Sequence, residues 1–426
     1  VDTTGRLVAG KGAIGNVIEE SWFGYSVNSE SEPDFPEAGV ELKVTPYIRN
    51  RNGIRAKERL VCNIINYMEE CDKAFDTSAF WHKCNTMLLM SYEHITGRPK
   101  GDLHIDAAIL FRFPEEDLII IEHDWETIIN KVRAGKAHEI SEGDTLYLAA
   151  CTKGANASSV RPQPFSNIPA KQRAYSLKAS YMTQILNKYI FGDVEEPRII
   201  RHWRSLQHCT FEDHIMQKVS PFYRKTQQEL KDLFAVDSNA KSLNEILLAR
   251  MLGVPGRIGH TDEFRKAGII PKTIRVRRDG FIKESMSFPA FDFIELANET
   301  EWEESTLYNY LAPAKFMFVI FKQRSDGQYA FDRVMFWNIP NEDLEQVRLV
   351  WERTVRAIRV GVRSTPMSGG ISNDLPKKSE NPVAHVRPHG RDGSDKLPLP
   401  DGRMMTKQCF WLNNTYIREQ IERSVV

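Results

Sequence analysis

The chain has 426 residues, more than one hydrophobic core usually organises, which indicates two domains. Apolar residues make up 41% of the sequence, but no run of them is long enough to span a bilayer, and the polar N-terminus does not resemble a signal peptide. Lys plus Arg equals Asp plus Glu at 57 each, so the net charge indicates no nucleic-acid partner, and such a contact would need a local basic surface.

The six cysteines are spread over the whole chain, and none forms a CxxC pair. This spacing is poor for a zinc site and too sparse for a disulfide framework. The cysteines are Cys62, Cys71, Cys84, Cys151, Cys209 and Cys409. We therefore expect reduced thiols and a cytoplasmic protein.

Strand and helix patterns alternate along the first half of the chain. An amphipathic helix is predicted at 11–24, and a longer one at 115–133, where Pro114 precedes apolar residues at helical spacing. Residues 154–172 are rich in Pro, Ser, Asn and Gln and are expected to form a loop. Further strands are predicted at 39–45, 85–92, 105–113 and 145–151, and a further helix at 175–189. This interleaving predicts an α/β or α+β domain.

The sequence then repeats itself. Residues 34–43 (DFPEAGVELK) align with residues 263–272 (EFRKAGIIPK). At the same offset, Gly24 falls on Gly253, and the helix before it falls on residues 242–252. The identical positions of the motif are Phe35, Ala38, Gly39 and Lys43. Because the matches recur in the same order, we expect two copies of one fold.

The two copies suggest the domain limits. Residues 175–181, late in the first copy, resemble residues 410–416, late in the second. We therefore expect one domain at 1–205 and a related domain at 218–426. Residues 222–241 precede the first match of the second copy. Since their counterpart would lie mostly ahead of the first residue given, we expect a further N-terminal segment.

One group of charged residues in the first copy has the spacing of a metal-dependent hydrolytic site. Glu41 and Lys43 are two positions apart in a predicted strand and point to one face, and Asp34 stands just before that strand. Carboxylate oxygens suit Mg²⁺, which can polarise a phosphodiester and activate water, while the lysine orients the water or stabilises charge. The pattern D-x6-ExK is short and also arises as ordinary surface charge, so its context must decide.

Two further residues extend the candidate site. Glu19 lies on the preceding helix and could supply a third carboxylate, or it is a solvated residue beside Glu20. Lys83 stands just before a predicted strand and could contact the phosphate, or it blocks pairing at a strand edge. His82 is a candidate general base, although a structural or solvent-facing role is favoured.

The second copy has lost these acids. Glu41 is replaced by Ile270, Glu19 falls on Leu248, and Asp34 becomes Glu263. The glycine and apolar positions that form the fold remain. Acids with a purely structural role could also be replaced in this way. The loss of all the proposed metal ligands together, however, favours a second domain that binds DNA and does not cut it.

The motifs together have the form KGxxGxxxE, then D-x6-ExK, then a lysine after a histidine. In this chain they are Lys11, Gly12, Gly15 and Glu19, then Asp34, Glu41 and Lys43, then His82-Lys83. They resemble the MutH family of mismatch-repair nicking endonucleases. They resemble still more the two-domain, GATC-cutting type II restriction enzymes related to MutH. The resemblance implies tandem restriction-endonuclease-like domains of the PD-(D/E)xK, MutH-like type in the α/β (α+β) class, the second catalytically degenerate.

The resemblance also implies a site, a cofactor and a substrate. Its metal ligands would be Asp34 and Glu41 with Glu19 assisting, and its catalytic lysines would be Lys43 and Lys83. The cofactor would be Mg²⁺ and the substrate double-stranded DNA, cut at GATC.

Base recognition in the family uses an Arg-Pro-Lys segment after a strand. The first half of this chain has Cys151-Thr152-Lys153, without the arginine, so this domain reads its site differently or reads another site. The second half keeps Arg387-Pro388. The candidate DNA contacts are Lys153, Arg161, Tyr175 and Lys178 in the first half, and Arg387 and His389 in the second.

The second domain resembles an allosteric DNA-binding module that holds another copy of the site. Basic residues at 275–278 and the segment 385–391 fit that role, and a stabilising scaffold is the alternative. The Pro/Gly-rich stretch 363–403 is expected to be partly disordered without DNA. The resemblance leaves open self-association on DNA.

Three functions are consistent with these motifs. The favoured one is a type II restriction endonuclease, and the runner-up is a strand-nicking repair endonuclease that needs an activating partner. The duplication argues against the runner-up. A non-catalytic DNA-binding regulator is the third, and the intact motif of Asp34, Glu41 and Lys43 argues against it.

Overall fold

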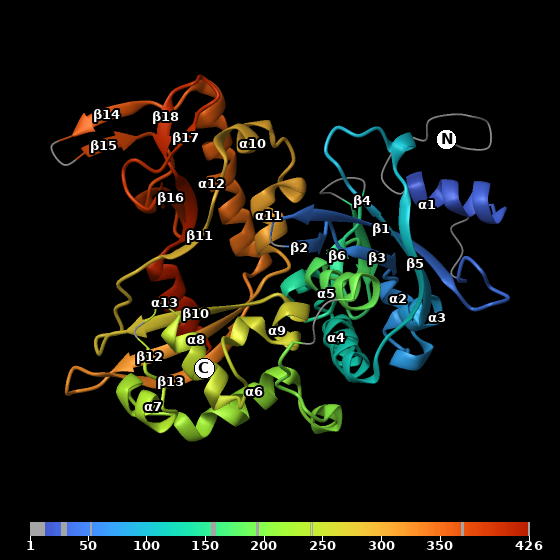
Figure 1. The fold of residues 1–426 in the computed structure, drawn as a ribbon, viewed down its shortest axis with the longest axis horizontal. Coiled ribbons are helices and arrows are strands. Elements are labelled where there is room, and N and C mark those ends of the chain that lie inside the picture. The colour runs from blue at the N-terminus through green and yellow to red at the C-terminus, as the bar shows by residue number, and fades with distance from the viewer. Residues whose placement is uncertain are drawn as a thin grey trace. The chain divides into compact units, whose positions relative to one another are not determined.

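The computed structural model describes residues 13–26, 32–51, 53–154, 159–192, 196–238, 240, 242–367 and 370–424 (Figure 1). The chain divides into two compact units. Unit 1 comprises Val1–Pro221, Ser238–Pro271 and Lys315–Met317, and unit 2 comprises Phe222–Asp237, Lys272–Ala314 and Phe318–Val426. This division differs from the two sequence copies, because residues 242–271 lie in unit 1. The limits 1–205 and 218–426 therefore stay a prediction about the copies.

Unit 1 contains two sheets, of strand order β2-β1-β4-β5 and β3-β9-β6. In the larger sheet β1 runs parallel to β4, with Glu41 opposite Met87, and β4 runs antiparallel to β5 (Figure 1). A separate hairpin joins β7 and β8. The strands are β1 (Glu41–Asn50), β2 (Gly53–Ala56), β3 (Leu60–Ile64), β4 (Thr86–Glu93), β5 (Ile105–Arg112), β6 (Leu148–Thr152), β7 (Val160–Gln163), β8 (Ser166–Lys171) and β9 (Arg173–Leu177).

The helices of unit 1 follow the apolar pattern of the sequence. The predicted long helix is confirmed as α4 (Glu115–Arg133), which begins after Pro114 and buries apolar residues such as Ile121 and Trp125. The first helix ends at Gly24, whose φ of 76° is the left-handed conformation that favours glycine. The remaining helices are α1 (Ala13–Val17) with a π-helical turn at Ile18–Phe23, α2 (Tyr67–Glu70), α3 (Ala79–Cys84), α5 (Ala179–Ile185), α6 (Phe211–Val219), α8 (Leu243–Met251) and α9 (Asp262–Ala267).

Unit 2 has two sheets of strand order β10-β12-β13 and β11-β19-β16, and two hairpins, β14–β15 and β17–β18. Its strands are β10 (Ile269–Val276), β11 (Met286–Ala290), β12 (Lys315–Gln323), β13 (Tyr329–Trp337), β14 (Ser364–Met367), β15 (Gly370–Asn373), β16 (Ala384–Pro388), β17 (Lys396–Pro398), β18 (Met404–Thr406) and β19 (Gln408–Leu412). Its helices are α7 (Gln227–Leu233), α10 (Phe293–Asn298), α11 (Thr306–Leu311), α12 (Asn341–Val360) and α13 (Asn414–Arg423).

Strand pairing confirms the predicted duplication. The order β10-β12-β13 corresponds to β1-β4-β5, and β11-β19-β16 corresponds to β3-β9-β6. The register shifts between Val61 and Ile64 where β3 meets β9, and between Ser287 and Ala290 where β11 meets β19. Because the same irregularity recurs at the same point, the two copies share their backbone pairing as well as a motif. We call residues 13–192 the first repeat and residues 242–424 the second repeat.

Two local predictions are wrong. Residues 154–172, predicted as a loop, contain the β7–β8 hairpin. Residues 175–177, predicted as the start of a helix, lie in the central strand β9, and α5 begins only at Ala179. In both cases strand pairing overrides the local composition. The described part of 363–403 contains β14, β15, β16 and β17, and its partial disorder without DNA stays a prediction.

None of the helices in the described ranges is long and apolar enough to cross a membrane. All six cysteines are free thiols, five of them buried and Cys209 partly exposed.

Candidate active site

The predicted motif residues converge at the start of β1. Asp34 lies beside a turn closed by a bridge between Phe35 and Val40. The Asp34 carboxylate accepts a hydrogen bond from the N–H of Leu42 at 3.0 Å, and the Glu41 carboxylate accepts one from the N–H of Asp34 at 3.1 Å. Each acid is therefore held by the backbone next to the other, which places the two carboxylates side by side.

Two lysines contact Glu41, which is only 1% exposed. The Lys43 ammonium donates to Glu41 Oε1 at 2.6 Å, which confirms that these two residues share one face of the strand. It also donates to the carbonyl of Cys62 on β3 at 3.3 Å. The Lys83 Nζ lies 3.7 Å from Glu41 Oε2. A buried carboxylate needs such compensation, and the two ammonium groups supply it.

The last turn of α3 brings Lys83 and His82 to the segment before Asp34. Lys83 Nζ donates to the carbonyl of Glu32 at 3.1 Å, and His82 Nε2 lies 2.9 Å from the Glu32 carboxylate. Lys83 thus holds the backbone of Glu32, two residues ahead of Asp34, and His82 holds the side chain of the same residue. The contact with Glu32 therefore supports a structural role for His82, as the sequence favoured.

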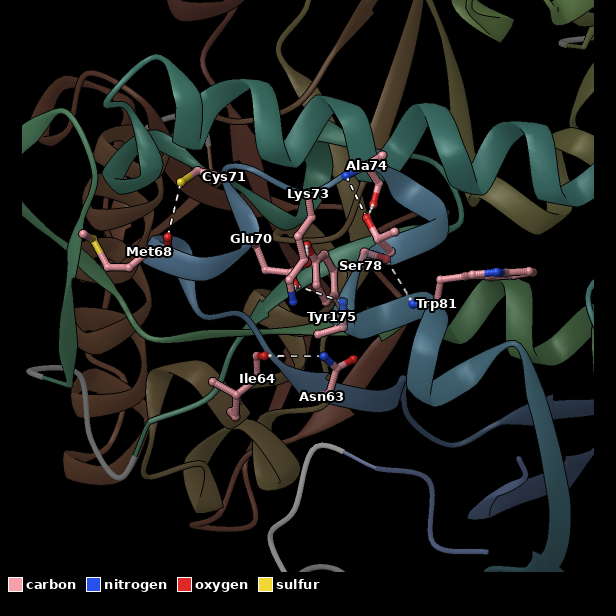
Figure 2. A network of polar contacts seen from close by, with 12 residues as sticks. Asn63, Ile64, Met68, Glu70, Cys71, Lys73, Ala74, Ser78, Trp81 and Tyr175 are labelled. Atoms are coloured by element: carbon pink, nitrogen blue, oxygen red, sulfur yellow. Dashed lines mark hydrogen bonds and ion pairs between the residues drawn. The ribbon is translucent and has the colours of Figure 1, made fainter. Parts of the chain in front are cut away.

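A buried network around Glu70 holds α3 in place (Figure 2). The Glu70 carboxylate accepts hydrogen bonds from the N–H of Ala79 at 2.9 Å, from Lys73 Nζ at 2.9 Å and from the Tyr175 hydroxyl at 3.1 Å. Ser78 caps the same helix with its side chain. The start of α3 is thus tied to α2 and β9, which sets where Lys83 emerges at its end.

The acids of the site have perturbed proton affinity. Burial raises the pKa of Glu41, and although Lys43 opposes the rise, the charge of Asp34 adds to it. Burial also raises the pKa of Glu19, and the charges of Asp34 and Glu41 raise it further. Glu19, the predicted third carboxylate, is therefore close enough to sense both other acids.

The charges fit a divalent cation, although the described ranges hold no group of three or more His, Cys, Asp or Glu side chains already arranged around a metal position. Asp34 raises the pKa of Glu19 and of Glu41, so like charges crowd together here. A cation would relieve that repulsion, and carboxylate oxygens are the ligands that Mg²⁺ prefers. Glu19, Asp34 and Glu41 are accordingly the residues that would hold it.

The second repeat has no equivalent of this acidic cluster. Ile270 occupies the position of Glu41, and the buried Leu248 occupies that of Glu19. Lys272, at the position of Lys43, donates to the carbonyl of Ser287 at 3.3 Å. The strand and its lysine are retained while the ligands are gone.

The one acid kept in the second repeat has a different use. Glu263, at the position of Asp34, is buried and accepts hydrogen bonds from the N–H groups of Ile199 at 3.0 Å and Ile200 at 2.8 Å. These bonds engage both oxygens of the carboxylate with backbone. Glu263 thus acts in the described structure as a backbone anchor of unit 1.

Four of the six predicted DNA contacts reach the surface. Lys153, Arg387 and His389 are exposed, and Arg161 is partly exposed. The Arg387 guanidinium lies over the ring of Trp411, 4.3 Å from its centroid. These four remain candidates for DNA contacts.

Tyr175 and Lys178 lie in the core instead, at 0% and 3% exposure. The Tyr175 hydroxyl donates to Glu70, and the Lys178 ammonium donates to the carbonyl of Thr145. The two residues were predicted to lie at a helix start, but Tyr175 lies within the central strand β9, and Lys178 stands between that strand and α5, inside the protein. Neither presents a polar group to DNA in this structure.

Two contributors to the site were missed in the sequence. Glu32 could have been found, because it directly precedes the Pro33-Asp34 motif. Glu70 carries no such signal, since only the folded arrangement brings it to Ala79 and Tyr175.

The fold and site together define a nuclease of the PD-(D/E)xK class. A mixed sheet carries Asp34 and Glu41 at the start of its central strand, with Lys43 on the same face and a second lysine from the adjacent helix.

Comparison with known proteins identifies the family. The family model of the DNA mismatch repair enzyme MutH matches residues 23–124. The chain is 40% identical to the type II restriction enzyme Sau3AI of Staphylococcus aureus, over 97% of this chain and 92% of that protein. It is 29% identical to the DNA mismatch repair protein MutH of Shewanella woodyi and 28% identical to that of Haemophilus influenzae. These two alignments cover 44% and 42% of this chain and 80% of each relative. The chain belongs to the MutH-related type II restriction endonucleases.

Proposed function

We propose that this restriction endonuclease uses Mg²⁺ to hydrolyse both strands of duplex DNA at GATC. The observation that carries the proposal is the contact of Glu41 with both Lys43 and Lys83, beside Asp34. A buried acid between two ammonium groups and a second acid is a costly arrangement, and metal-assisted phosphodiester hydrolysis gives a reason for it. The GATC sequence is what the resemblance to the two-domain, GATC-cutting restriction enzymes implies.

In the proposed mechanism Asp34 and Glu41, assisted by Glu19, would hold Mg²⁺, which would polarise the phosphodiester and lower the pKa of a water. Lys43 orients the attacking water or stabilises negative charge on the phosphate. Lys83 contacts the phosphate from the end of α3. The hydrogen bonds that Asp34 and Glu41 accept from the backbone keep both acids oriented while this occurs.

For the second repeat we propose DNA binding without cleavage, as an allosteric effector that holds a second copy of the site. The replacement of Glu41 by Ile270 and the exposed Arg387 and His389 support this. The enzyme would then engage two DNA sites, with self-association on DNA as an open extension. The six free thiols support action in the cytoplasm.

A nicking repair endonuclease is the alternative from the same family. The alignments with the MutH proteins cover only 44% and 42% of this chain, about the length of one repeat. The presence of a second repeat argues against this alternative. A regulator that only binds DNA would have no use for the acids around Lys43.

The test is incubation of the purified full chain with plasmid DNA, with Mg²⁺ or with a chelator, followed by sequencing of the product ends. The Glu41→Gln variant is the inactive control. Mg²⁺-dependent double-strand cuts at GATC support the whole proposal. Cuts at another sequence overturn the site, nicks alone support the repair alternative, and Mg²⁺-independent cutting overturns the metal mechanism.

A further inference from the structure

The end of β6 and the end of β16 are built alike. The N–H of Lys153 donates to the carbonyl of Gln172 at 2.9 Å, and the N–H of His389 donates to that of Lys407 at 2.9 Å. A hairpin follows each strand. Its pairs are Val160↔Lys171 and Arg161↔Ala170 in the first repeat, and Lys396↔Thr406 and Leu397↔Met405 in the second. The two surfaces can therefore be compared position by position.

The two repeats carry an arginine on different strands of this surface. In the second repeat Arg387 lies on β16, exposed and stacked over Trp411. The equivalent position on β6 is Cys151, which is 1% exposed and reaches no surface. On the hairpin the first repeat has the arginine and the second does not, because Arg161 corresponds to Leu397. At these two positions each repeat thus has one arginine, supplied by β16 in the second repeat and by β7 in the first.

Gln172 fixes Arg161 beside Lys153. The Arg161 Nε donates to Gln172 Oε1 at 3.1 Å, while the Gln172 carbonyl accepts from Lys153 and its N–H donates to Ser159. One residue therefore ties the arginine, the lysine and the base of the hairpin together. Arg161 forms no ion pair with an acid among the described residues, so its charge is not neutralised there.

The neighbouring Arg173 is a weaker candidate for a DNA contact. It lies opposite Thr152, but it is only 3% exposed, and its Nη1 donates to the carbonyl of Ala150 at 2.6 Å. Its guanidinium is occupied inside the protein. Arg161 is partly exposed, and among the described residues it is bonded through Nε alone, which leaves its terminal nitrogens available to a ligand.

We propose that Arg161 is the guanine-reading residue of the catalytic repeat, replacing the arginine that is absent at Cys151. A guanidinium can donate two parallel hydrogen bonds to O6 and N7 of guanine, the commonest specific base contact. Gln172 is its positioning residue, and Lys153 contributes positive charge at the same edge. This inference rests on the proposed function, because it assumes that the first repeat cuts at a site containing guanine.

The experiment measures single-turnover cleavage of the duplex that the wild-type enzyme cuts, containing either guanine or 7-deazaguanine, which lacks N7. Cleavage at GATC by the wild-type enzyme tests the proposed function alone, because a failure at that step does not depend on Arg161. Arg161→Ala is expected to cut the guanine duplex about ten- to a hundredfold more slowly. It should also lose the sensitivity to 7-deazaguanine that the wild type shows.

Arg161→Lys and Lys171→Ala complete the test. Arg161→Lys keeps the charge but not the paired donors, so it should behave like Arg161→Ala. Lys171→Ala removes an exposed charge from the facing strand of the same hairpin and should leave the sensitivity to 7-deazaguanine unchanged. If Arg161→Ala keeps the wild-type sensitivity, or if Arg161→Lys cuts like the wild type, the proposal is overturned. Circular dichroism of each variant separates misfolding from lost recognition.

Discussion

The two repeats have one backbone plan and two different interiors. The strand pairing of β3 with β9 recurs between β11 and β19, including its irregularity. In the first repeat Tyr175 donates to the buried Glu70, whereas the corresponding residue of the second repeat is the apolar Phe410. The acidic cluster of the first repeat is likewise not kept, because Ile270 and Leu248 occupy the positions of Glu41 and Glu19. Backbone register therefore preserves the fold, while the side chains that it carries differ.

The helices that precede β4 and β12 begin alike in the two repeats. The N–H of Ala79 at the start of α3 is bound by Glu70, and the N–H of Thr306 at the start of α11 is bound by Glu299 at 2.8 Å. Both helices also have a serine cap, at Ser78 and Ser305. The difference lies in what the helix carries, because α3 bears Lys83 in its last turn and α11 has no lysine.

The largest effect is expected at Glu41. Glu41→Gln should lower the cleavage rate by on the order of a thousandfold or more, because it removes a charged ligand from the proposed cation. Ile270→Ala, the matched change in the second repeat, should leave the rate of the chemical step nearly unchanged. Single-turnover cleavage measures both, and an equal loss in the two variants would remove the contrast between the repeats.

Lys43 and Lys272 give the next comparison. Lys43→Ala should slow cleavage by on the order of a hundredfold, as expected for loss of a charge-stabilising group. Lys272→Ala removes an equivalent strand lysine that has no acid on its face at Ile270, so it should have little effect on the rate. A similar loss in both variants would mean that this lysine serves the fold and not the reaction.

Glu19→Gln should change activity and stability in opposite directions. Its raised pKa means that the folded protein retains a proton that the unfolded chain releases, so stability in metal-free buffer falls as the pH rises from 4.5 through the raised pKa. Glu19→Gln should therefore raise the melting temperature by roughly 2 to 4 °C at neutral pH without metal, while cleavage falls. Thermal unfolding with a chelator across pH measures this. A lower melting temperature in the variant would contradict the account of repulsion.

The smallest effect concerns the buried hydroxyl of Tyr175. Tyr175→Phe places the residue of the second repeat into the first and should cost about 1 kcal/mol of stability, because Glu70 loses one donor. DNA affinity should not change, since the hydroxyl does not reach the surface. Denaturant unfolding and fluorescence anisotropy measure the two quantities. A large fall in affinity without loss of stability would restore Tyr175 as a DNA contact.

Local sequence signals predicted the parts of the fold that depend on local patterns. Helix α4 and the ligand strand β1 follow from apolar periodicity and from the spacing of Glu41 and Lys43. The β7–β8 hairpin and strand β9 did not follow, because their polar or mixed composition matches loops and helices until pairing with neighbouring strands is known. Tyr175 was misplaced for that reason.

The site divides in the same way. Asp34, Glu41 and Lys43 lie within ten residues and could be found as one pattern. The contacts of Lys83 with Glu32 and of Arg161 with Gln172 join segments that are separate in the sequence. Only the folded chain brings such pairs together, so no spacing rule could have predicted them.

The most direct test of the central claim is a calorimetric titration of the full chain with Mn²⁺, as a stand-in for Mg²⁺, in matched variants of the two repeats. Asp34→Asn changes the proposed metal ligand, and Glu263→Gln changes the acid at the corresponding position, which binds backbone instead. The account predicts that Asp34→Asn abolishes tight metal binding and that Glu263→Gln leaves it unchanged. Unchanged binding in Asp34→Asn, or its loss in Glu263→Gln alone, would contradict the claim that only the first repeat holds the catalytic metal.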